Sequence, residues 1–156
     1  MSKIATIIDE MRAEIALLSG FTVKTEIPNP YALDIDGDNS DLFLKDGWGL
    51  RLTSSSEPNN SEFNRTSTLQ GFGIILTREV IRTAHTAEPM YTAIKAMFED
   101  ELTLRKYLLN PQSLVNTEAD SRLSTTEIQT LLPLEEGGKK FITITVNFNL
   151  RISELL

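Results

Sequence analysis

The chain has 156 residues, of which 40% are hydrophobic and 24% charged, with a formal net charge of −7 and no cysteine. A chain of this length predicts one domain, 1–156, around one core, and the lack of cysteine excludes disulfides and thiolate metal sites. The acidic balance and scattered basic residues argue against sequence-specific nucleic-acid binding, and no apolar run approaches the roughly 20 residues that span a bilayer.

The first predicted element is an amphipathic helix from Ser2 to Leu18. Ser2 is suited to cap its start and Gly20 to close its end. Charged residues such as Asp9 and Arg12 interrupt the apolar positions, so we expect mature structure here rather than a signal sequence. The apolar residues recur at steps of three and four, which places them on one face: Ile4, Ile7, Ile8, Met11, Ile15 and Leu18.

Strands and loops are predicted over the next part of the chain. Residues 21–27 are rich in β-forming side chains and predict a strand, followed by a loop to Asn39. Asp46-Gly47, between the apolar runs 42–44 and 48–52, predicts a tight hairpin of two strands.

A polar segment and a glycine-containing strand follow the predicted hairpin. The segment 54–67 predicts a loop that is mobile in a free monomer. Residues 69–77, which include Gly71 and Gly73, predict a central strand that bends or bulges.

A second helix is predicted to open at Glu88-Pro89 and to end at Asn110-Pro111. Its apolar face is expected to consist of Tyr91, Ile94, Phe98, Leu102 and Leu109.

The last two runs, 123–134 and 139–152, flank Glu135-Glu136-Gly137-Gly138 and predict a long C-terminal β-hairpin. The final run alternates strictly, which is typical of a strand with one buried face. That face holds Ile142, Ile144, Val146, Phe148, Leu150 and Ile152. The element order predicts an α+β fold in which the N-terminal amphipathic helix and the second helix pack on an antiparallel sheet, with a mixed sheet as the alternative.

Few residues suggest chemistry. Asp34, Asp36 and Asp38 alternate like calcium ligands, but the glycine and glutamate that an EF-hand loop requires are absent from their positions, so a solvated turn is favoured. His85 is the only histidine, and nothing marks a nucleophile or a second metal ligand for it. Gly71-Phe72-Gly73 lacks the rest of a phosphate-binding loop. We therefore expect no catalytic, cofactor or metal site and no enzymatic activity.

Contact surfaces are the remaining candidates. The polar face of the last strand is mostly Thr and Asn rather than Lys and Glu, and the 54–67 loop is longer than most connections. For Trp48 a core position is favoured, with an interface anchor as the alternative. The candidate interface residues are Trp48, Glu57, Asn60, Phe63, Arg65, Thr143, Thr145, Asn147, Asn149 and Arg151.

The segments GFGIILTREVI, MYTAIKAMFEDELTLRKYLL and FITITVNFNLRISELL, in this order, resemble the tail terminator and tail-completion proteins of the neck of long-tailed bacteriophages. The resemblance rests on element order, size and the character of the last strand, and it carries over no individual functional residue. The segment 28–40 departs from it.

The resemblance implies a structural virion protein, assembled in the host cytoplasm and located in the phage neck. It would form a ring, usually a hexamer, that caps the tail tube, ends tube polymerisation and joins the tail to the head completion or stopper proteins. DNA would pass through the lumen without specific binding, which fits the acidic charge. The alternatives are another head–tail connector or stopper protein, a small metal-dependent enzyme using the three aspartates, and a peptide-binding module.

Overall fold

The computed structural model describes residues 2–23, 25–27, 30, 46–56, 65–80, 86–113, 115, 120–123, 134–136 and 139–155. In chain order the elements are α1 (Lys3–Ala16), β1 (Gly47–Ser56), β2 (Arg65–Val80), α2 (Glu88–Leu109), β3 (Asp120–Leu123), β4 (Leu134–Glu136) and β5 (Lys139–Leu155). The predicted α+β class is confirmed. In the described part of the chain, neither helix is long and apolar enough to cross a membrane.

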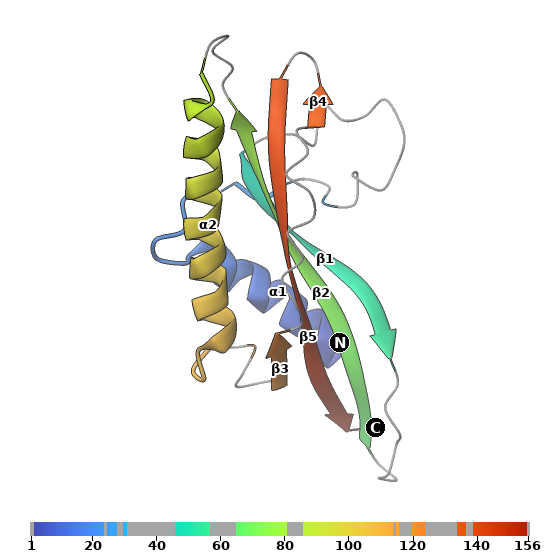
Figure 1. Cartoon of the computed structure of the whole chain (residues 1–156). Helices are drawn as coiled ribbons and strands as arrows, with labels where there is room; N and C mark the ends of the chain where they lie inside the picture. Colours follow the sequence, from blue (N-terminus) through green and yellow to red (C-terminus); the bar gives the residue numbers. More distant parts are fainter. Residues whose placement is uncertain are drawn as a thin grey trace.

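The sheet is built around the antiparallel pair of β2 and β5. Their register runs unbroken from Arg65 opposite Leu155 to Val80 opposite Lys140. β1 lies on the outer side of β2, while β3 and β4 both pair with β5, so the order is β1-β2-β5-β3 with β4 beside β5 (Figure 1). All named strands pair antiparallel, and the short β4–β5 pairing is the part of the predicted C-terminal hairpin that the structure describes.

One face of the sheet forms the core, as the alternation in the last strand predicts. The six apolar residues of β5 from Ile142 to Ile152 are all buried. Phe148 stacks on Phe72 of β2 with ring centroids 5.4 Å apart, and Trp48 of β1 lies opposite Leu76 of β2 in the register. A period of two therefore places these side chains under the helices.

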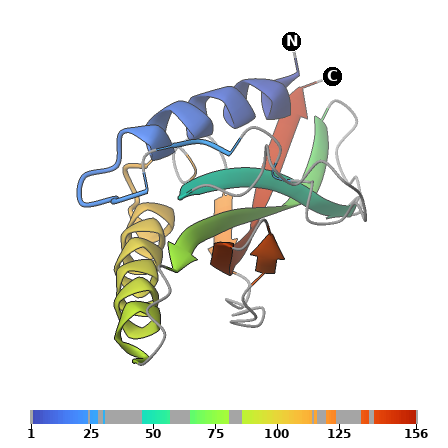
Figure 2. The same ribbon diagram turned by 90° about the horizontal axis from the view of Figure 1, so that it is seen from above.

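The two helices cover this apolar face and cross each other at a large angle (Figures 1 and 2). α1 begins after Ser2, whose hydroxyl accepts a hydrogen bond from the Ala5 backbone N–H, as predicted. It buries Ile7, Met11 and Ile15. Gly20, just beyond the helix, has a φ of 80°, a conformation that favours glycine.

The first and last described segments lie side by side (Figure 2). The backbone N–H of Lys3 donates to the Glu154 carboxylate, and the Lys3 ammonium lies 3.4 Å from the Ser153 carbonyl oxygen. The start of α1 is therefore fixed to the end of β5.

The predicted strand at 21–27 is wrong over its described residues, which make only one isolated bridge, parallel, between Glu26 and Trp48. Ile27 N–H donates to the Trp48 carbonyl, and Trp48 N–H donates to Thr25. Nearer the start of the segment, the Thr22 N–H donates a hydrogen bond to the Asp100 carboxylate of α2. A long-range side-chain contact has replaced strand pairing here.

The predicted limits of the 54–67 loop also need correction. β1 continues to Ser56 and β2 begins at Arg65, so both ends of that segment are strand; residues 57–64 lie outside the described part. The bend or bulge predicted for the glycine-containing strand, β2, lies on β1 instead. There the register shifts between Leu52 and Ser55, opposite Gly71 of β2. The run 42–44, predicted as the first strand of a hairpin, lies outside the described residues. The second strand of that predicted hairpin is part of β1, which pairs with β2.

The apolar face predicted for α2 is wrong for four of its five residues. Tyr91, Phe98, Leu102 and Leu109 are exposed, and only Ile94 packs partly against the core. The buried face holds Ala93, Met97, Asp100, Glu101, Leu104, Tyr107 and Leu108. Four of the large apolar side chains of this helix thus point away from the core, whereas Met97 and Leu104 point into it.

Candidate functional site

The polar residues predicted on β5 lie on the sheet face opposite the helices. Thr145 is buried and Arg151 is exposed, while Thr143, Asn147 and Asn149 are half-buried. A Cβ added to Gly73 of β2 would lie 3.0 Å from Asn147 Oδ1, so the glycine leaves room for that amide. The structure brings these five residues together along one strand, and their predicted role in contacts stays a prediction.

The other predicted interface residues are not gathered with them. Trp48 is fully buried in the core, and its indole N–H has no hydrogen-bond partner among the described residues. Arg65 is the first residue of β2, opposite Leu155. Glu57, Asn60 and Phe63 lie outside the described part of the chain.

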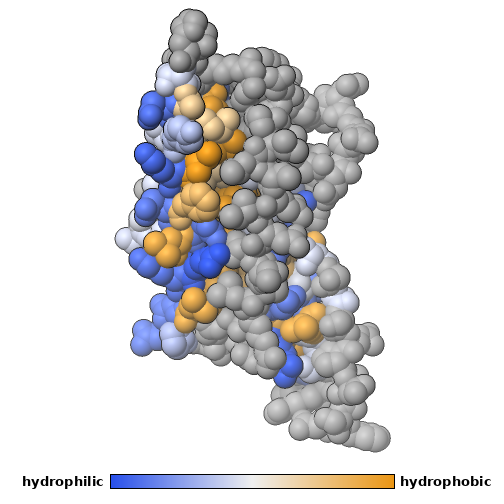
Figure 3. Space-filling model, viewed as in Figure 1, coloured by the Kyte–Doolittle hydropathy of each residue, from blue (hydrophilic) through white to orange (hydrophobic). Residues whose placement is uncertain are grey.

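Sequence reasoning missed the outward orientation of the α2 stripe, which we define as Tyr91, Phe98, Leu102 and Leu109. Their exposed fractions are 54%, 41%, 46% and 63%. They follow one another at steps of seven, four and seven, which keeps them on one line of the helix. Figure 3 shows apolar side chains along the exposed surface of α2, beside hydrophilic ones.

The orientation of α2 is fixed by a buried charge. Asp100 is fully buried, and its carboxylate accepts hydrogen bonds from the Thr22 N–H and hydroxyl, each at 2.7 Å. The Arg78 guanidinium of β2 pairs with the same carboxylate at 2.5 Å and also donates to the Thr22 hydroxyl. A buried carboxylate is stable only with such partners, so α2 cannot rotate about its axis without breaking them.

A second polar contact joins α2 to α1. The Tyr107 hydroxyl donates to Glu14 Oε2 at 2.6 Å. Burial, together with the hydrogen bond to Glu14 and its charge, raises the pKa of Tyr107 well above its ordinary value. Six residues before Tyr107, the buried Glu101 is paired with Arg105 at 2.8 Å. These contacts explain how Asp100, Glu101 and Tyr107 are accommodated among the apolar residues of the inner face of α2.

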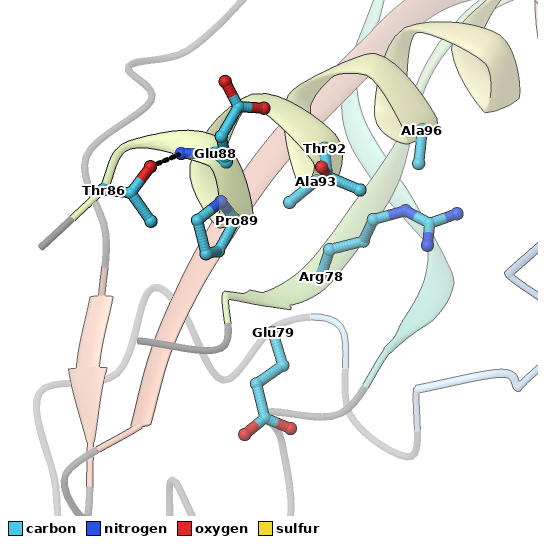
Figure 4. A pocket seen from close by; sticks show the side chains of 8 residues that line it. All are labelled: Arg78, Glu79, Thr86, Glu88, Pro89, Thr92, Ala93 and Ala96. Carbon is cyan, nitrogen blue, oxygen red and sulfur yellow. Dashed lines mark hydrogen bonds between the residues drawn. The ribbon is translucent and has the colours of Figure 1, made fainter. Parts of the chain in front are cut away.

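A hollow of about 470 Å³ lies between the end of β2 and the first turns of α2. Its walls include Arg78, Glu79, Thr86, Glu88 and Thr92 (Figure 4). Figure 4 shows the Glu79 and Glu88 side chains pointing away from each other, and Arg78 is held by Asp100. The two carboxylates therefore do not form the close pair that acid–base chemistry would use.

The described residues contain no group of three His, Asp or Glu side chains positioned to hold a metal ion. Asp34, Asp36, Asp38 and His85, which the sequence offers for such chemistry, lie outside the described ranges. The metal hypothesis therefore stays an alternative prediction.

No model of a known protein family matches this chain, and no curated protein matches it.

Proposed function

We propose that this chain is a structural virion protein of the phage neck. In this proposal its copies form a ring that caps the tail tube, ends tube polymerisation and joins the tail to the head completion proteins. The protein acts by shape and contact, and it needs no cofactor. DNA passes through the lumen without specific binding, since a chain of net charge −7 repels a polyanion.

The observation that carries this proposal is the α2 stripe. Four large apolar side chains on one helical line, all more than 40% exposed, are unusual for a monomer and typical of a protein–protein contact. An antiparallel sheet covered by two helices supports the proposal further, because the same element order underlies the resemblance to tail terminator proteins.

Electron microscopy of particles made with and without this chain tests the proposal. We expect uncapped tubes of irregular length when the chain is absent, and tubes of uniform length joined to heads when it is restored. Normal tails in its absence would refute the role in capping.

Another head–tail connector or stopper protein is the alternative, since exposed apolar contact surface serves either position in the neck. Labelling the chain in intact virions separates the two. Label at the end of the tail tube supports the terminator, whereas label at the portal side supports the connector.

A further inference from the structure

We draw no further inference here: the strongest candidate, the exposed apolar stripe on the outward face of α2, is a surface patch for which nothing in the structure shows what covers it.

Discussion

At the scale of single residues, the stability of the fold depends on a few buried polar groups. Asp100 connects α2 with β2 and with the segment after α1, through Arg78 and Thr22. None of these partners is near Asp100 in the sequence. A buried carboxylate with this set of partners contributes little net energy compared with an apolar core, but losing one partner leaves a charge uncompensated.

We expect Asp100→Ala to lower the free energy of unfolding by about 3–5 kcal/mol, because it leaves the Arg78 guanidinium, only 17% exposed, without its counter-charge. Urea unfolding followed by circular dichroism measures the change. Glu99→Ala is the matched control: this neighbouring carboxylate is exposed, and its loss should change stability by less than about 0.5 kcal/mol. Equal effects of the two substitutions would contradict the role assigned to Asp100.

The raised pKa of Tyr107 predicts that the free energy of unfolding depends on pH in the alkaline range. Its pKa is raised in the folded protein, whereas in the unfolded chain it ionises near about pH 10. The unfolded state therefore loses a proton above about pH 10 that the folded state keeps, and stability falls as the pH rises.

Comparing the unmodified protein with Tyr107→Phe isolates this effect. Below about pH 9 the substitution should cost about 1.5–3 kcal/mol, the usual worth of a hydrogen bond to a charged group. Above about pH 10 the difference between the two proteins should shrink. A difference that stays constant through this range would show that Tyr107 does not titrate as its burial requires.

At the scale of elements, local pattern predicted the last strand and the buried face of α1 correctly, whereas it failed for the buried face of α2 and for a strand at 21–27. The prediction of the final strand was correct because apolar and polar residues alternate along it without interruption. Burial of the apolar residues follows that alternation. On α2 the larger apolar residues suggested the wrong inner face. Its true inner face includes Asp100, Glu101 and Tyr107, whose partners lie far away in the sequence or on the helix itself.

The two candidate contact surfaces show the same division. The polar side of β5 was read from its alternation, and the structure places it opposite the helices. The α2 stripe was read as core, because periodicity identifies a line of apolar residues without showing what the line faces. Long-range contacts, with Thr22 and Arg78 around Asp100 and Glu14 on Tyr107, fix which side of the helix turns inward.

The edge strand β1 provides a test at this scale. A Cβ on Gly49 would lie 2.6 Å from Pro30 Cβ, a ring atom with little freedom to move. We expect Gly49→Ala to destabilise the protein by about 1–3 kcal/mol, measured by thermal unfolding. Gly73→Ala should cost less, since its nearest neighbour, at 3.0 Å, is the end of the Asn147 side chain. The reverse order would contradict the described approach of Pro30 to the sheet.

At the scale of the whole molecule, stability is concentrated in the long pair of β2 and β5. These strands share sixteen register pairs, and β2 is also paired with β1 on its other side. Hydrogen exchange should therefore find the slowest amides between Phe72 and Leu76 and between Ile144 and Phe148. Faster exchange there than in α2 would place the stable part of the molecule elsewhere.

The neighbouring positions of Lys3 and Glu154 have a practical consequence for purification and imaging. A fluorescent protein or an affinity tag fused to either terminus emerges from the same corner of the molecule, on the side away from α2 (Figure 1). A pair of fluorophores, one at each terminus, stays close together as long as the fold is intact. Their energy transfer therefore reports on unfolding and leaves the outward surface of α2 free of added groups.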